Sequence, residues 1–205
     1  MPSNMEIKVK VDDLEKLTRK AEELSASEGE IIEQSDVFFN VPQGRLKYLE
    51  GNGPITGHID NSRAPRNKGA PAEHHGLENV LRYLQNRPSQ LIFYERDDKS
   101  GPKMSNFHIA TTNNPDDLAN VLSHALGQKG IVKKRRLLYL VGQTRVHCDD
   151  VEGLGHFMEL EVVMKENQSA TEGEAIAKDL MSKLGLKDAD LVKGAYIDLL
   201  SSQNA

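Results

Sequence analysis

The stretch GHFMELEV, residues 155–162, places two carboxylates two positions apart in an otherwise apolar run. Side chains two apart in a β-strand point to the same face. Glu159 and Glu161 therefore share one face of a predicted strand. The opposite face carries Met158, Leu160 and Val162. Such a polar face is either simply solvated or the wall of a site, and neighbouring strands must decide between these readings.

Several other strand-like segments alternate in the same way, and their polar faces are rich in cations. The run VKKRR does not fix its own register, so it offers either the pair Lys134 and Arg136 or the pair Lys133 and Arg135. Two further carboxylates fall on these faces, Glu6 in the first segment and Asp149 in the seventh. The remaining cations on the polar faces are Lys8, Lys10, Arg45, Lys47, Arg96, Lys103 and Arg145.

If the strands close into a barrel with the charged side inward, these polar faces together line one interior. So many cations could not stay buried without partners, because desolvating each one is costly. Lys and Arg suit phosphate oxygens, and clustered carboxylates suit a hard divalent cation such as Mg²⁺ or Mn²⁺. A triphosphate chelated to a divalent ion satisfies both halves, so the sequence predicts that kind of small-molecule partner.

The elements that would position these residues are strands in series, interrupted by a few amphipathic helices. This order favours an α+β protein built on an antiparallel sheet or barrel. Residues 51–88 are rich in Gly, Pro and Asn, and we interpret them as a flexible insertion, with a short helix in LENVLRYLQNR, in one domain spanning 1–205. The predicted strands span 4–11, 30–41, 44–50, 90–96, 102–111, 130–141, 143–150 and 156–164. The predicted helices span 12–27, 114–126, 170–185 and 191–200.

The composition excludes several classes of protein. The net charge of −5 argues against a nucleic-acid binder, and no apolar run is long enough to span a membrane. The N-terminal residues lack the apolar core of a signal peptide, and a single cysteine, Cys148, forms no disulfide framework. We therefore expect a reducing, cytoplasmic setting, no membrane and no specific nucleic-acid partner, and we leave a homodimer open.

Six segments, in order, resemble the CYTH proteins, also called triphosphate tunnel metalloenzymes. That family is marked by an N-terminal E-x-E-x-K strand, and here NMEIK supplies Glu6 and Lys8, with Asn4 in place of the first glutamate. The other similar segments are QSDVFFNVPQGRLK, LIFYERDDKSGPKMS, VKKRR, TRVHCDDVEGLGHFMELEV and GAYIDLL. The resemblance implies an eight-stranded antiparallel β-barrel, the triphosphate tunnel, with flanking helices.

The resemblance also implies roles for the charged residues. Its V-x-K-x-R spacing, starting at Val132, selects Lys134 and Arg136. The catalytic residues would be Glu6, Lys8, Glu159 and Glu161, and the metal ligands, for Mg²⁺ or Mn²⁺, would be Glu6, Asp149, Glu159 and Glu161. The phosphate-binding residues would be Lys8, Arg45, Lys47, Arg96, Lys103, Lys134, Arg136 and Arg145.

Three functions stay open, because the same tunnel residues serve each of them. The first is metal-dependent hydrolysis of a triphosphate, whether inorganic tripolyphosphate, thiamine triphosphate or a nucleoside triphosphate. The second is a class IV-like adenylyl cyclase, which converts ATP to cyclic AMP and pyrophosphate. The third is a binding module without catalysis, a hypothesis that rests on Asn4 and on Leu49, where many members carry a second arginine.

Two histidine positions allow more than one interpretation. His147 shares the inward face with Arg145, and it could act as an acid or base or form a structural hydrogen bond. The pair His74 and His75 falls in the flexible insertion, where we interpret it as solvated. Cys148 should point outward into the packing between strands and helices, where it would not act as a nucleophile.

Overall fold

The computed structural model describes residues 2–25, 27–49, 89–112 and 114–203. The predicted insertion at 51–88, the helix expected within it and the pair His74 and His75 lie outside these residues. The strands are β1 (Ser3–Lys10), β2 (Glu30–Phe39), β3 (Arg45–Leu49), β4 (Ser89–Arg96), β5 (Lys103–Thr112), β6 (Gln128–Val141), β7 (Thr144–Val151) and β8 (Gly155–Val163). The α-helices are α1 (Leu14–Leu24), α3 (Pro115–Leu126), α4 (Ala170–Leu184) and α5 (Tyr196–Gln203), with a 3₁₀ turn η2 at Asp188–Asp190.

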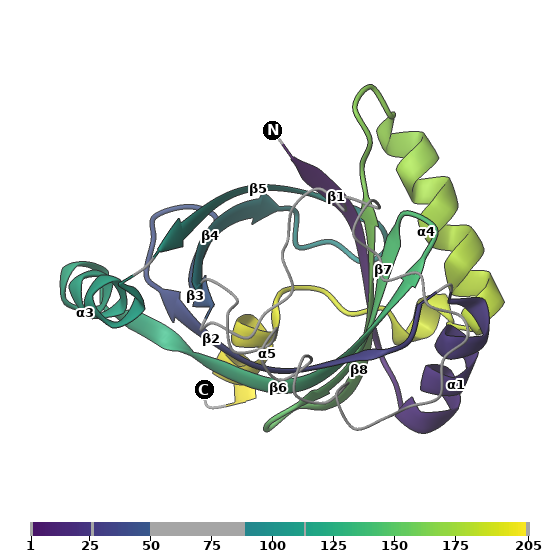
Figure 1. Cartoon of the computed structure of the whole chain (residues 1–205), viewed down its shortest axis with the longest axis horizontal. Helices are drawn as coiled ribbons and strands as arrows, with labels where there is room; N and C mark the ends of the chain where they lie inside the picture. The colour runs from purple at the N-terminus through teal and green to yellow at the C-terminus, as the bar shows by residue number, and fades with distance from the viewer. Residues whose placement is uncertain (1, 26, 50–88, 113, 204–205) are drawn as a thin grey trace, which may run out of the picture.

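The eight strands form a closed antiparallel barrel in the order β1-β5-β4-β3-β2-β6-β7-β8, which Figure 1 shows end-on. The first strand closes the barrel, because β1 pairs with β5 on one side and with β8 on the other. A closed barrel has no free edge strand, so every strand has hydrogen-bonded neighbours on both sides. The predicted α+β barrel with flanking helices is therefore confirmed.

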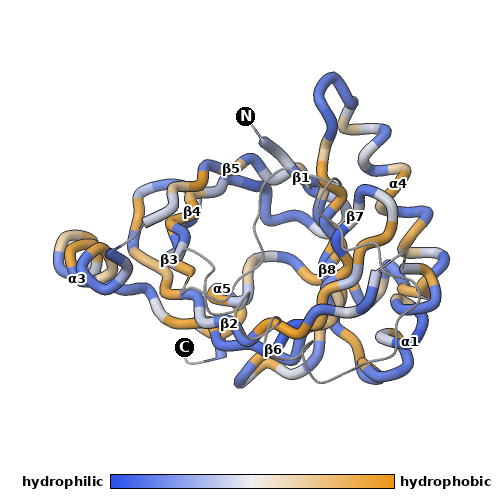
Figure 2. Tube along the Cα trace, viewed as in Figure 1, coloured by the Kyte–Doolittle hydropathy of each residue, from blue (hydrophilic) through white to orange (hydrophobic). Residues whose placement is uncertain are grey.

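Each strand turns one face to the barrel interior and the other to the outside, and hydrophilic and hydrophobic residues alternate along the tube in Figure 2. The outward side chains of β1, β7 and β8 form an apolar core with α1 and α4. Met158, Leu160 and Val162 are fully buried in this core, at 0% exposure each. The alternation read from GHFMELEV is thus correct, with the apolar set outside and the glutamates inside.

The helix α4 packs against β1 and β8 and has well-formed ends. Ser169 and Glu172 form a reciprocal capping box at its start, and Gly185 ends it in the left-handed conformation, with φ of 75°. Within the described ranges, no helix is both long and apolar enough to cross a bilayer.

The segment after α4 crosses the outline of the barrel in Figure 1 before it reaches α5. It is tied to the first strand, since Val192 N donates to Lys8 O at 2.9 Å and Leu191 bridges to Val9. The helix predicted at 191–200 begins only at Tyr196, because this extended pairing and Gly194, at φ of 75°, occupy the residues before it.

Candidate active site

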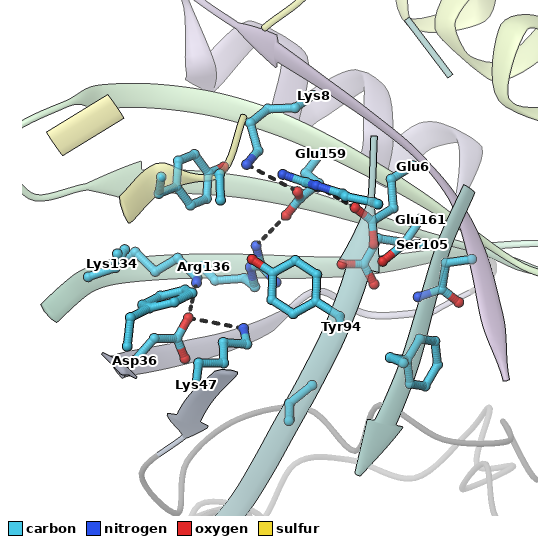
Figure 3. A pocket seen from close by; sticks show the side chains of 18 residues that line it. Glu6, Lys8, Asp36, Lys47, Tyr94, Ser105, Lys134, Arg136, Glu159 and Glu161 are labelled. Carbon is cyan, nitrogen blue, oxygen red and sulfur yellow. Dashed lines mark hydrogen bonds and ion pairs between the residues drawn. The ribbon is translucent and has the colours of Figure 1, made fainter. Parts of the chain in front are cut away.

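The barrel interior contains a polar cavity of about 100 Å³ that opens to solvent. Figure 3 shows its lining side chains, which come from strands all around the barrel and from the start of α5. Eight of the twelve predicted site residues line it, namely Glu6, Lys8, Lys47, Arg96, Lys134, Arg136, Glu159 and Glu161. The register choice within VKKRR is thereby settled in favour of Lys134 and Arg136, since Lys133 and Arg135 are exposed outside.

One side of the cavity is a group of three carboxylates on β1 and β8, Glu6, Glu159 and Glu161, which we call the acidic wall. The antiparallel register brings them together, because Glu6 lies opposite Glu161 and Lys8 lies opposite Glu159. Each carboxylate has a cationic partner. Glu6 pairs with Arg96, Glu159 lies 3.4 Å from Lys8, and Glu161 accepts from Arg145 at 3.0 Å.

Burial and ion pairing set the charge states of the acidic wall. Burial raises the pKa of the Glu6 carboxyl despite its contact with Arg96. Burial alone would also raise the pKa of Glu159, but Lys8 and Arg136 outweigh it and hold that pKa well below its ordinary value. Burial lowers the pKa of Lys8 to about 8.

The opposite side of the cavity holds Asp36, Lys47 and Lys134, which we call the lysine wall (Figure 3). Asp36 accepts from Lys47 at 3.2 Å and from Lys134 at 3.0 Å, and Gln34 donates to both of its oxygens. Burial raises the pKa of Asp36, but the two lysines and Gln34 outweigh it, so the net pKa is lowered. One buried carboxylate therefore serves two ammonium groups, that of the buried Lys134 and that of the partly buried Lys47.

The sequence analysis missed Asp36 and Gln34. The signal was present, because Gln34, Asp36 and Phe38 alternate along β2 in the segment EIIEQSDVFFNV. It also missed Tyr196, whose ring lies 3.7 Å from Lys8 Nζ and whose hydroxyl donates to Asp149 at 2.8 Å. The position of Tyr196 depends on the path of the segment after α4, which no local pattern reveals.

The other four predicted residues lie outside the cavity lining and have protein partners. Asp149 accepts two hydrogen bonds of 2.6 Å from Arg136, in addition to the one from Tyr196. Arg145 pairs with Glu161, and Lys103 donates to two backbone carbonyls. Arg45 binds Asp198 of α5 at 2.7 Å. Of the four predicted metal ligands, three are thus gathered in the acidic wall and Asp149 is held apart by Arg136.

His147 lies beside the acidic wall and is fully buried, at 0% exposure. Its Nδ1 is 3.9 Å from Glu161 Oε1, and neither ring nitrogen has a hydrogen-bond partner among the described residues. Ligand atoms of His147, Glu159 and Glu161 all lie within 4.8 Å of one another, so this group could hold a metal ion. The structural hydrogen bond considered for His147 is therefore absent from the described part of the chain.

Cys148, the next residue, points the other way. It belongs to the apolar core under α1 and α4, and burial raises the pKa of its thiol to about 11. This outward orientation agrees with the sequence-based expectation. Because the thiol stays protonated, it does not form the thiolate that would act as a nucleophile.

Comparison with known proteins identifies the family and the fold. Residues 79–196 match the model of the CYTH domain. A curated protein named adenylate cyclase CyaB, from Aeromonas hydrophila, is 30% identical over 123 residues, which are 59% of this chain and 61% of that protein. The chain therefore matches less than two thirds of this relative's length.

Solved structures share the fold at lower identity. The PH1012 protein from Pyrococcus horikoshii OT3 superposes with a TM-score of 0.70 at 23% identity, covering 96% of this chain and 98% of that one. HpAC1 from Hippeastrum, for which a dominant triphosphatase activity is described, superposes with a TM-score of 0.56 at 11% identity, covering 99% and 96%. With more than half of its length matched by the family model, and with the closed barrel and inward-facing charges of the triphosphate tunnel, this chain belongs to the CYTH domain family.

Proposed function

We propose that this protein hydrolyses a triphosphate-containing small molecule in a reaction that depends on a divalent metal ion. The observation that carries the proposal is the combination, in one cavity, of cations from opposite walls with the three carboxylates of the acidic wall. A triphosphate needs cations along its whole length, and an ion chelated to it needs carboxylate oxygens. The lining cations are Lys8, Lys47, Arg96, Lys134 and Arg136.

The side chains fit a divalent ion at the acidic wall. Glu6, Glu159 and Glu161 line the cavity and offer oxygen donors of the kind that Mg²⁺ and Mn²⁺ prefer, whereas Asp149 lies outside the lining and pairs with Arg136 and Tyr196. When bound, such an ion supplies Lewis-acid charge and lowers the pKa of a water molecule. We therefore assign the metal to the three glutamates, with Asp149 as the residue that orients Arg136.

The protein groups contribute positioning and charge stabilisation. In phosphoryl transfer, negative charge shifts among the phosphoryl oxygens, and fixed cations that face those oxygens stabilise the transition state. The lysine wall can hold one end of the triphosphate while Lys8, Arg96 and Arg136 hold the end beside the glutamates. To bind in this way, the phosphates must replace the internal carboxylates as partners of the cations. In the free protein, the carboxylates therefore occupy the positions that phosphate oxygens would take.

A second candidate is cyclisation of ATP to cyclic AMP and pyrophosphate. It is favoured by the similarity to the protein named adenylate cyclase CyaB and by apolar side chains in the cavity lining, against which a nucleobase could rest. Those side chains are Phe38, Ile92, Phe107 and Val132.

The test is a substrate panel of tripolyphosphate, thiamine triphosphate and ATP, each with Mg²⁺ or Mn²⁺, assayed for phosphate and for pyrophosphate. We expect phosphate release, and we expect Glu159→Gln to reduce it by roughly 100-fold or more. Asp150→Asn is the matched control, because Asp150 is exposed on the outer face of the adjacent strand.

The products separate the hypotheses. Pyrophosphate with cyclic AMP establishes the cyclase instead, and tight triphosphate binding without any turnover establishes a binding module. Full metal-dependent activity in Glu159→Gln would show that the site assignment is wrong.

A further inference from the structure

His147 lies beside the acidic wall, and the proposed mechanism leaves it unused. It is fully buried, and among the described residues neither of its ring nitrogens has a hydrogen-bond partner. A buried imidazole without partners forfeits the hydrogen bonds it makes to water in the unfolded chain, which is costly. A buried polar group without a protein partner calls for another partner, such as an ordered water or an ion. Two of the neighbours of His147 on β8, Glu159 and Glu161, are carboxylates that could share a cation with it.

We propose that His147, Glu159 and Glu161 form a mixed nitrogen and oxygen metal site that prefers a first-row transition ion to Mg²⁺. This inference rests on the proposed function only in requiring a divalent ion at the acidic wall. It places His147 beside two of the three glutamates, Glu159 and Glu161, as a ligand, and it specifies the kind of ion that the site selects.

The backbone register brings the three donors together. His147 lies opposite Glu159 on the neighbouring strand β8, and Arg145, two residues before His147, lies opposite Glu161. His147 and Glu161 are thus diagonal neighbours on one face, and their side chains approach to 3.9 Å. This diagonal arrangement follows from antiparallel pairing and from the alternation of both strands.

The donor atoms are arranged to receive an ion. Glu161 accepts a hydrogen bond from Arg145 through Oε2, and its Oε1 is the oxygen that faces His147 Nδ1. Two ligands of one ion, each about 2.1 Å from it, are at most about 4.2 Å apart. The separations of 3.9 Å for the pair and within 4.8 Å for the whole group therefore need only a small inward rotation of the side chains.

The neighbouring charges and the unpartnered ring both suit a cation beside His147. Glu159 and Glu161 are carboxylates on the adjacent strand that attract a divalent ion, and a ring nitrogen of His147 without a hydrogen-bond partner among the described residues can supply a lone pair to it. The cavity gives access, since both glutamates line it.

The chemistry of the donor set decides which ion is preferred. Mg²⁺ binds oxygen ligands almost exclusively and keeps several waters. Imidazole suits borderline ions such as Co²⁺ and Zn²⁺ better than the harder Mn²⁺, and the affinity of a nitrogen-containing site rises from Mn²⁺ to Co²⁺ along the Irving–Williams order. A site of one nitrogen and two carboxylates should therefore bind Co²⁺ and Zn²⁺ tightly, Mn²⁺ less tightly and Mg²⁺ least.

The test uses the metal alone, without substrate. Mn²⁺ is titrated into the metal-free protein, and pulsed electron paramagnetic resonance measures magnetic coupling between the ion and nearby nitrogen nuclei. We expect a nitrogen coupling that changes when the histidines carry ¹⁵N, and a calorimetric affinity for Co²⁺ at least roughly tenfold above that for Mg²⁺. Because these measurements use the wild-type chain, they do not depend on whether a variant folds.

Variants assign the nitrogen to one histidine. His147→Gln should abolish the coupling and weaken Co²⁺ binding by roughly tenfold to 100-fold, whereas His156→Gln, at an exposed position facing Asp150, should leave both unchanged. Mn²⁺ bound without histidine coupling, or a coupling that survives in His147→Gln, overturns the inference. That result leaves the proposed hydrolysis intact, whereas histidine-coupled Mn²⁺ in a protein without turnover defeats the proposed hydrolysis and upholds this site.

Discussion

The inner and outer faces of β1, β7 and β8 are both hidden from solvent, but different forces hold them. On the outer face, Leu160 packs against apolar neighbours under α1 and α4 at 0% exposure. On the inner face, Glu159 is 7% exposed and depends on Lys8 and Arg136 for charge compensation. Burial of apolar side chains stabilises the folded state directly. Burial of ions destabilises it through lost hydration, and only their ion-pair partners offset that loss.

This difference implies that a bound ligand can compensate buried charges on the inner face but cannot replace apolar packing on the outer face. A polyanion that enters the cavity can replace internal carboxylates as the partner of the cations. A variant that lacks an inner-face carboxylate should therefore gain more stability from the polyanion than the wild type does. An outer-face defect should gain only as much stability from the ligand as the wild type gains, because the ligand binds inside the barrel. The predictions below test that separation, from the largest expected effect to the smallest.

The largest effect should come from Asp36→Asn, which removes the one carboxylate shared by Lys47 and Lys134. Breaking a buried ion pair costs about 3 to 5 kcal/mol, because the remaining charge is left without compensation. We expect that loss in the free energy of unfolding, measured by urea denaturation. Saturating tripolyphosphate should restore much of it, since phosphate oxygens can compensate the two ammonium groups.

The control for Asp36→Asn is Glu33→Gln on the same strand. Glu33 pairs with Arg135 on the outside, where both side chains are largely exposed, so the change should be within about 0.5 kcal/mol. If Asp36→Asn gained no more stability from tripolyphosphate than the wild type does, ligand and internal carboxylate would not be interchangeable.

Leu160→Ala should destabilise the outer face by about 3 kcal/mol, through lost burial and the cavity left behind. Here tripolyphosphate should add the same increment to the free energy of unfolding as it adds to the wild type, because binding to an unchanged site stabilises by mass action alone. Parallel urea denaturation curves with and without ligand provide the measurement. A larger increment in the variant would mean that the two faces are coupled.

The adjacent residues Lys133 and Lys134 allow a test of ligand binding across one strand. Lys134→Met should weaken tripolyphosphate binding by roughly 10-fold to 100-fold, the loss expected for one charged hydrogen bond. Lys133→Met, on the exposed face, should leave the calorimetric dissociation constant nearly unchanged. Equal effects of the two substitutions would point to general electrostatic attraction instead of a defined contact.

The smallest expected effect on stability near neutral pH concerns Cys148, because its thiol stays protonated there. Burial raises the pKa of this thiol to about 11, so at pH 8 it should react with a thiol-specific reagent roughly 100-fold more slowly than in denaturant. The folded state favours the neutral thiol, so its contribution to stability is complete below pH 9 and is lost as the pH rises from about 9 to 11. Rapid labelling of the native protein at pH 8 would contradict this burial.

Alternation along single strands was enough to predict which residues face inward on β1, β7 and β8, whereas on β6 the choice of Lys134 and Arg136 came from the spacing shared with the family. Alternation could not predict which charged side chains form ion pairs with one another, because that depends on strand register and on closure of the barrel. Arg136 was expected to bind phosphate, and the register gives it Asp149 as well. The missing hydrogen-bond partners of His147 are likewise a property of the assembled barrel and leave no trace in the segment TRVHCDD.

The expected roles that stay predictions are those of individual residues toward metal and substrate. Asn4 illustrates why local sequence falls short. Its amide oxygen, in the orientation that satisfies both neighbours, accepts from Arg145 at 2.9 Å, so it buttresses the partner of Glu161. A neutral residue in a position where the family usually has a carboxylate thus has a defined contact of its own.

Closure of the barrel through β1 also shapes how the chain must fold. The first strand lies between β5 and β8, so its full set of backbone partners exists only after residues 155–163 have been made. Contacts between distant parts of a chain form slowly, because loop-closure entropy is lost before they are gained. During synthesis, β1 emerges early and waits for the last strand, which makes its pairing with β8 the expected rate-limiting step of folding.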